Sequence, residues 1–253
     1  MAQAERSQPV QSLFDLLRLP ETLAEHDLAI LASFGVRRAV LSLPATTEAG
    51  VTAKQETARL RRAGIVPFLS FGLSPGVLPG AALEAELQRL PGLLSLPRAI
   101  ALGPLSLRTV EPGAEYAFER MLALAAELHR PIVIRSEPAA TGREVRRLLA
   151  LVRASRFPPE NVLGVSLPAS ALVLFRECGH AIGVGLSRAL PGRQLVETVQ
   201  RLGSERLLLV GEGGDFLSLP KAAGLLEEGK LPAAVVRRVA LENALKFFRI
   251  DEP

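Results

Sequence analysis

Residues 98–136 read RAIALGPLSLRTVEPGAEYAFERMLALAAELHRPIVIRS and contain two short apolar runs on either side of an amphipathic segment. The runs at 99–102 and 132–134 include β-branched residues, as is typical of strands that are buried on both faces. Between them, apolar residues recur at the spacing of one helix face: Phe118, Met121, Leu122, Ala125 and Leu128. The stretch therefore predicts a strand–helix–strand crossover with parallel strands and a right-handed connection.

The same alternation continues in both directions along the chain. Strands are predicted at 12–17, 38–43, 66–71, 99–102, 132–135, 161–166, 181–185 and 206–211. Helices are predicted at 21–34, 50–63, 81–90, 115–128, 142–155, 169–177, 192–202, 219–228 and 232–248. Such an eightfold βα alternation is typical of a TIM barrel. We therefore predict a single α/β domain, a (β/α)8 barrel over residues 11–253, preceded by a polar tail at 1–10.

A doubly wound open sheet is the main alternative fold. Such a sheet needs a glycine-rich nucleotide-binding turn after its first strand. The segment from Asp15 to Glu21 contains no glycine. The barrel is therefore favoured.

Composition limits the class of protein. With 48% apolar and 22% charged residues, the chain has the composition of an ordinary globular protein. No apolar run approaches the roughly 20 residues of a membrane span, and the first nine residues lack the apolar core of a secretory signal. Cys178 is the single cysteine, so no internal disulfide can form. We therefore expect a cytoplasmic protein without a membrane contact.

The chain is basic, with a net charge of +4 and a pI of about 9.8. Only four of its 30 basic residues are lysines. Nucleic-acid binding usually combines clustered basic residues with exposed aromatic rings. Here the arginines are spread along the sequence, often beside acidic residues, and aromatic residues make up 4% of the chain. These features argue against nucleic acid as a partner.

The histidines do not have the positions of barrel metal ligands. In a TIM barrel the chemistry lies at the C-terminal ends of the strands. His26 and His129 fall in or at the end of predicted helices, and His180 precedes a predicted strand. This argues against a His or Cys metal centre. Four acidic residues near strand ends offer a carboxylate-only alternative for Mg²⁺, although solvated loop acids are the simpler interpretation: Asp15, Glu137, Glu212 and Asp215.

Five segments resemble the TatD-related branch of the amidohydrolase superfamily in order and spacing. They are FLSFGLSPGVLP (68–79), AIALGPLSL (99–107), LAAELHRPIVIRS (124–136), GSERLLLVGEGGDFLSLPKAA (203–223) and ENALKFF (242–248). The resemblance extends from Phe14 to Phe248. It implies a metal-bearing TIM barrel that hydrolyses phosphodiester or related bonds.

The positions that match the metal ligands of that family carry other residues. The Asp-x-His-x-His motif begins at Phe14-Asp15, and its two histidines fall on Leu17 and Leu19. The His-Pro of the third strand falls on Ser74-Pro75, and the bridging Glu on Pro104. The histidines of strands five and six fall on Arg135 and Ser166, and the Asp of strand eight falls on Glu212. Leucine and proline side chains cannot ligate a metal, and an arginine would repel one.

These substitutions favour an anion pocket in place of a metal centre. We expect a ligand site formed by Arg135, Ser136, Ser166, Arg18, Ser74 and Asp215. An ion pair between Arg135 and Glu212 that fills the former site is the simpler alternative. The sequence thus predicts a non-catalytic relative without metal or cofactor that binds a small anionic ligand or a protein partner.

Two alternatives remain open. One is a divergent hydrolase that uses Glu212 and Asp15 with a weakly held divalent metal. The other is an inert structural subunit of an assembly. The apolar segment at 247–250 would offer a surface for a homo-oligomer or another partner.

Overall fold

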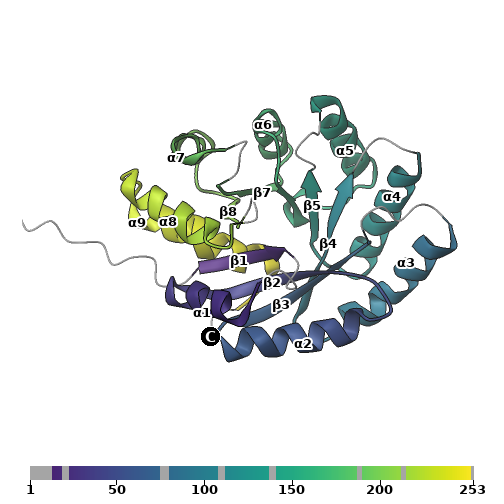
Figure 1. Ribbon diagram of the computed structural model, residues 1–253. Helices are drawn as coiled ribbons and strands as arrows, with labels where there is room; N and C mark the ends of the chain where they lie inside the picture. Colours follow the sequence, from purple (N-terminus) through teal and green to yellow (C-terminus); the bar gives the residue numbers. More distant parts are fainter. Residues whose placement is uncertain are drawn as a thin grey trace, which may run out of the picture.

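The computed structural model describes residues 13–18, 23–74, 80–107, 112–136, 141–186, 190–211 and 215–251. Eight parallel strands form one sheet in the order β1 to β8, and a helix follows each strand (Figure 1). The sheet curls into a nearly closed barrel with the helices outside. The (β/α)8 prediction is confirmed, whereas the proposed tail at 1–10 lies outside the described residues.

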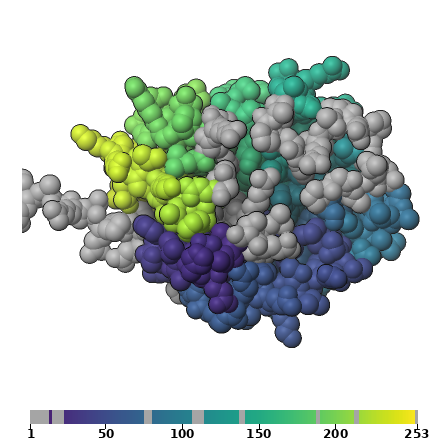
Figure 2. Space-filling view, in the orientation of Figure 1, coloured from purple at the N-terminus to yellow at the C-terminus, as the bar shows by residue number. Residues whose placement is uncertain are grey.

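The strands are β1 Leu13–Arg18, β2 Val36–Pro44, β3 Val66–Gly72, β4 Ala99–Leu107, β5 Ile132–Ser136, β6 Val162–Val165, β7 Ala181–Val184 and β8 Leu207–Leu209. The helices are α1 Glu25–Ser33, α2 Ala49–Arg62, α3 Ala81–Leu94, α4 Pro112–Glu127, α5 Gly142–Ala154, α6 Ala169–Glu177, α7 Gly192–Leu202, α8 Ser218–Glu228, α9 Ala233–Arg237 and α10 Asn243–Phe248. In the space-filling view, consecutive colours lie side by side around the outside, as expected for elements that follow one another around a barrel (Figure 2).

Local sequence explains where individual elements begin. At the start of α5, the Thr141 hydroxyl accepts a hydrogen bond from the Glu144 amide at 3.3 Å. The Glu144 carboxylate accepts one from the Thr141 amide at 2.6 Å. This reciprocal pair is a capping box, which satisfies two amides that the helix itself cannot pair. The helix then buries one apolar stripe against the sheet: Val145, Leu148, Leu149, Leu151 and Val152.

Most elements differ from their predicted bounds by one to four residues, and two differ more. The final predicted helix, 232–248, is divided into α9, a π-helical turn at Arg238–Glu242, and α10. Strand β4 runs to Leu107 instead of ending at 102, because it passes through a register irregularity between Leu102 and Leu105. Pro104 has no amide hydrogen to donate to a ladder, so sequence rules end the strand there. The bulge allows the strand to continue.

Aromatic side chains fill the N-terminal end of the barrel. The ring centroid of Phe14 in β1 lies 5.9 Å from that of Phe68 in β3 and 5.7 Å from that of Phe248 in α10. These rings belong to one buried cluster with interior side chains of the strands. Helix α10 therefore closes the N-terminal end, and the opposite end is where a site can form. Among the described helices, none is both long and apolar enough to cross a bilayer.

Candidate functional site

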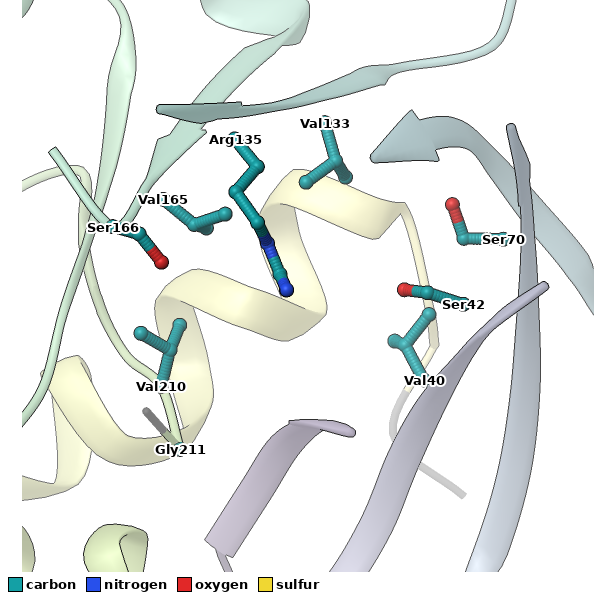
Figure 3. Close-up of a pocket in the computed structure, with 9 residues that line it drawn as sticks. All are labelled: Val40, Ser42, Ser70, Val133, Arg135, Val165, Ser166, Val210 and Gly211. Atoms are coloured by element: carbon teal, nitrogen blue, oxygen red, sulfur yellow. The ribbon is translucent and has the colours of Figure 1, made fainter. Parts of the chain in front are cut away.

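A small cavity lies at the C-terminal ends of the strands, the end at which TIM barrels carry their chemistry. It is lined by residues from five strands or the positions directly after them: Val40, Ser42, Ser70, Val133, Arg135, Val165, Ser166, Val210 and Gly211. Figure 3 shows these residues around a single guanidinium group. The cavity volume is about 10 Å³, which is the room that about one water molecule needs.

Arg135 reaches this cavity from β5. Side chains alternate between the two faces of a strand, so Arg135 shares the interior face with Val133, which packs in the barrel cluster. In Figure 3 the guanidinium lies between Ser166 and Val210 on one side and Ser42 and Ser70 on the other. The Nε atom of Arg135 is buried. The four lining valines lower the local dielectric, which strengthens the attraction between this cation and an anion.

Three serines bring hydroxyl groups to the same cavity. Ser42 of β2 is in register with Ser70 of β3. The Ser70 hydroxyl is buried and donates a hydrogen bond to the Gly103 carbonyl at 2.6 Å. Ser166 follows β6 directly and has a φ of 54°, a left-handed conformation that costs a non-glycine residue roughly 1–2 kcal/mol. Such strained positions tend to cluster at functional sites.

The bulge in β4 supports this side of the cavity. Gly103 has a φ of 112° and precedes a cis peptide bond to Pro104. A Cβ atom at Gly103 would overlap the backbone carbonyl oxygen of Val133, and one at Gly72 would lie 2.9 Å from the carbonyl oxygen of Pro104. Glycine at both positions therefore allows β3 to approach β4 closely, and β4 to approach β5, the strand that carries Arg135.

The structure separates the predicted ligand residues into different environments. Arg135 and Ser166 line the cavity, whereas Ser136 is buried at the end of β5 and Ser74 follows β3. The Ser74 amide donates to the buried Glu86 carboxylate at 2.7 Å. Glu86 had no role in the sequence prediction, because only the fold brings α3 against the end of β3.

Asp215 has local partners at the start of α8. Its carboxylate accepts hydrogen bonds from Lys221 Nζ at 2.6 Å and from the Leu217 amide at 2.9 Å. The hydrogen bond from Lys221 is the main cause that holds the pKa of Asp215 below its ordinary range. Asp215 is exposed and is not among the residues that line the cavity.

The structure describes the remaining predicted site residues only in part, or not at all. Asp15 and Arg18 lie in β1, where Arg18 is in register with Ser42, and only their backbone is described. Glu212 and Glu137 lie outside the described residues. Ser42 was missed by the sequence prediction, although its position two residues after Val40 in a predicted strand was a usable signal.

The residues at this site do not fit a divalent cation. The lining consists of valine, serine, glycine and one arginine, and Arg135 brings a positive charge. Within the described part of the chain, no group of three or more His, Cys, Asp or Glu residues is placed to hold a metal. Divalent cations in proteins are held by carboxylate, imidazole or thiolate groups. No catalytic step through a metal can therefore be built on the described residues.

His180 lies at the N-terminal end of the barrel, opposite the cavity. It directly precedes β7, as its sequence position indicates. Its side chain is 3% exposed, and its Nδ1 lies 2.9 Å from the carbonyl oxygen of Pro159. Nδ1 must therefore carry the hydrogen. Nε2 is buried and has no hydrogen-bond partner among the described atoms. Protonation would place an unsatisfied N–H and a charge in the interior, and burial is the main cause that lowers the pKa of His180.

We expect His180 to make the fold sensitive to acid. Its folded-state pKa lies below the ordinary histidine value of 6.5, so the unfolded chain binds a proton that the folded chain excludes. The unfolding free energy is then at its full value above about pH 6.5 and falls as the pH drops through this value, by up to roughly 1.4 kcal/mol per pH unit. Urea unfolding of the wild type and of His180→Gln at several pH values measures this slope.

The same substitution at His26, whose side chain is 75% exposed, provides the control. His180→Gln should flatten the acid slope, and His26→Gln should leave it unchanged. Equal slopes in the wild type and His180→Gln would contradict the assignment.

Neither a protein-family model nor a curated protein matches the sequence. Solved structures do match over nearly the whole chain. The TatD-like protein from Archaeoglobus fulgidus superimposes with a TM-score of 0.73 at 20% identity, covering 94% of this chain and 100% of that chain. The phosphotriesterase homology protein from Escherichia coli, solved with phosphate in its active site, has a TM-score of 0.71 at 16% identity, covering 92% and 90%.

A lactonase from Listeria monocytogenes has a TM-score of 0.66 at 13% identity and covers 97% of this chain and 89% of that chain. All three identities are too low to transfer an activity, and they establish the fold alone. The chain thus has the fold of the TatD-like and phosphotriesterase-related TIM barrels.

Proposed function

We propose that the protein binds the anionic end of a small ligand at Arg135, in the barrel mouth, without metal-dependent hydrolysis. The observation that carries this proposal is the position of one arginine in a mostly apolar cavity at the C-terminal ends of the strands. At this end related barrels place their chemistry. A cation at this point favours an anion and disfavours a divalent metal.

The chemistry around Arg135 suits an oxyanion. A guanidinium presents several N–H donors in a fixed plane, which matches the geometry of phosphate and carboxylate groups. Hydroxyl groups of Ser42 and Ser166 lie on opposite sides of it and can adjust their direction (Figure 3). The remaining volume, about 10 Å³, is too small for a whole phosphate ester. The ligand would therefore present one or two terminal oxygens to Arg135.

The same charge argues against hydrolysis. A general base works best when its pKa lies near the operating pH. A carboxylate near Arg135 would have its pKa lowered by the positive charge, which makes it a weak base at neutral pH. The barrel would therefore hold its anion without activating a water molecule. Phosphate is the first probe to test, because it occupies the active site of the Escherichia coli phosphotriesterase homology protein.

The test is calorimetric titration with inorganic phosphate. Arg135→Gln should weaken binding at least tenfold, which corresponds to roughly 1.4 kcal/mol and is within the range for a lost charged hydrogen bond. Arg135→Lys should retain part of the affinity, because lysine keeps the charge but loses the planar fork. The matched control is Arg193→Gln, which removes a charge from a side chain that is 93% exposed and pairs with Glu197.

Two results would contradict the proposal. Equal phosphate affinity in the wild type and Arg135→Gln would show that phosphate binds at a site other than Arg135. A stoichiometric divalent metal in the purified protein, together with hydrolysis that disappears in Glu212→Gln, would show a divergent hydrolase instead. Elemental analysis by plasma mass spectrometry measures the metal content of the purified protein directly.

A further inference from the structure

The described walls of the mouth cavity are almost entirely uncharged. Of the described residues that line it, only Arg135 carries a charge. The other eight are four valines, three serines and a glycine. All four valines are buried: Val40, Val133, Val165 and Val210. This lining therefore offers an anion one unit of positive charge within a mainly apolar surface.

A single positive charge limits which anion this lining can hold. A carboxylate carries one negative charge, which one guanidinium group neutralises. A phosphate monoester carries about −1.5 to −2 at pH 7, so one guanidinium leaves part of its charge uncompensated. Beside apolar walls an uncompensated charge is costly, because it loses its water and gains no partner. The charge balance therefore favours a carboxylate.

Ser70 contributes an oxygen atom to the cavity but no hydrogen-bond donor. The residue is 1% exposed, and its hydroxyl donates to the Gly103 carbonyl at 2.6 Å. A serine hydroxyl has one proton, so this bond uses the only donor of the side chain. The lone pairs that remain on Ser70 cannot pair with the oxygens of an anion. The cavity is therefore poorer in donors than its three serines suggest.

The donors around Arg135 suit a planar group with two oxygens. A guanidinium can donate two parallel hydrogen bonds to the two coplanar oxygens of a carboxylate. In Figure 3 the Ser42 hydroxyl is directed toward Arg135 from across the cavity, where it can donate to one of the same oxygens. A phosphate group has a third strong acceptor oxygen, which lies outside the plane of the guanidinium fork. Hydrogen bonding thus agrees with the charge balance.

The size of the cavity leads to the same choice. Its volume of about 10 Å³ is the room that about one water molecule needs. A planar group can enter edge first, with both oxygens directed at Arg135. A tetrahedral group is wider in every direction, so its entry would displace the valine side chains. The cavity therefore accepts the end of a carboxylate more easily than the end of a phosphate.

We propose that the anionic end of the ligand is a carboxylate, so that the protein binds a small carboxylic acid in preference to a phosphate ester. This inference rests on the proposed function, because it specifies which anion Arg135 holds. The carboxylate oxygens occupy the cavity, and the rest of the ligand extends out of it. Phosphate also binds through Arg135, but more weakly than a carboxylate.

The test compares three probes in NMR titrations of the ¹⁵N-labelled full chain at neutral pH and constant ionic strength. Acetate is planar with one charge, methanesulfonate is tetrahedral with one charge, and methyl phosphate is tetrahedral with a higher charge. The buried Nε–H of Arg135 reports binding at the site, and Arg135→Gln identifies its signal by removing it. Acetate should bind roughly tenfold more tightly than methyl phosphate, because it leaves no charge uncompensated. Methanesulfonate should lie closer to acetate.

A second positive charge in the cavity should shift this preference. Ser42→Lys adds an ammonium group to the lining and should raise the affinity for methyl phosphate relative to acetate by roughly tenfold. Ser33→Lys is the matched control, because Ser33 is exposed in α1 and does not line the cavity. It should keep the preference of the wild type. Thermal unfolding shows whether each variant is folded, and the three probes on the wild type decide if Ser42→Lys is not.

The outcomes separate this inference from the proposed function. If methyl phosphate shifts the Arg135 signal with an affinity equal to or above that of acetate, the carboxylate assignment is wrong and the anion site remains. If methanesulfonate binds as weakly as methyl phosphate, the charge balance on which the assignment rests is contradicted. If none of the three probes shifts the Arg135 signal, the proposed function and this inference both fail.

Discussion

Gly103→Ala is expected to destabilise the fold by about 3 kcal/mol or more. The substitution forces an alanine into a φ of 112°, which costs roughly 1–2 kcal/mol. Its Cβ would also overlap the carbonyl oxygen of Val133, and overpacking of this kind costs typically 1–3 kcal/mol. For a chain of this size, 3 kcal/mol lowers the melting temperature by roughly 6–12 °C.

Gly50→Ala is the matched control. Gly50 lies in α2, and a Cβ there would meet no atom within 4 Å. Alanine is a better helix former than glycine, so this variant should match or exceed the wild type by up to about 1 kcal/mol. Calorimetric melting of the three proteins measures the difference. If Gly103→Ala melted at the same temperature as Gly50→Ala, β4 and β5 could not approach each other as closely as described at this point.

Gly103→Ala should also affect the mouth of the barrel. The Gly103 carbonyl accepts the hydrogen bond from Ser70, and Val133 lies two residues before Arg135 on β5. A shift of either strand would change the spacing between the guanidinium and the serine hydroxyls. Phosphate binding at low temperature should therefore weaken in the folded variant, whereas in Gly50→Ala it should not change.

The fold was predictable because the sequence patterns that specify its helices and strands are local and repeat along the chain. The amphipathic spacing of residues 115–128 and the apolar run at 132–135 both appear in the structure, as α4 and β5. The same two patterns, amphipathic helical spacing and a short apolar run, recur along the chain. One misplaced boundary therefore does not change the predicted architecture. The bulge in β4 escaped prediction because Gly103-Pro104 normally ends a strand. Only the neighbouring strands β3 and β5 reveal that it continues.

The site was predictable only in part. Arg135 was predicted because it ends a predicted strand, at the position where the fifth-strand histidine of the TatD-related family falls, and the structure brings it to the cavity. The partners of a polar side chain depend on elements that are distant in sequence. Asp215 therefore appeared to be a site residue although it pairs with Lys221.

Phe14→Ala is expected to destabilise the fold by roughly 3–5 kcal/mol, the range for a buried phenylalanine. Phe14 is almost fully buried and stacks with Phe68 and Phe248 at the N-terminal end. The substitution would leave a cavity between β1, β3 and α10. Chemical unfolding gives the loss directly. Phe34→Ala is the control, because the Phe34 side chain is 55% exposed and its removal should cost less than about 0.5 kcal/mol.

Comparing Phe14→Ala with Arg135→Gln separates stability from function. The aromatic cluster closes the N-terminal end of the barrel, and the arginine cavity lies at the C-terminal end. Phe14→Ala should lose stability yet bind phosphate normally under conditions where it is folded. Arg135→Gln should lose phosphate binding without a comparable loss of stability, because it leaves the aromatic cluster and the apolar core of the barrel intact. If Arg135→Gln unfolded the protein as Phe14→Ala does, Arg135 would be a structural ion-pair partner and the mouth would have no ligand to hold.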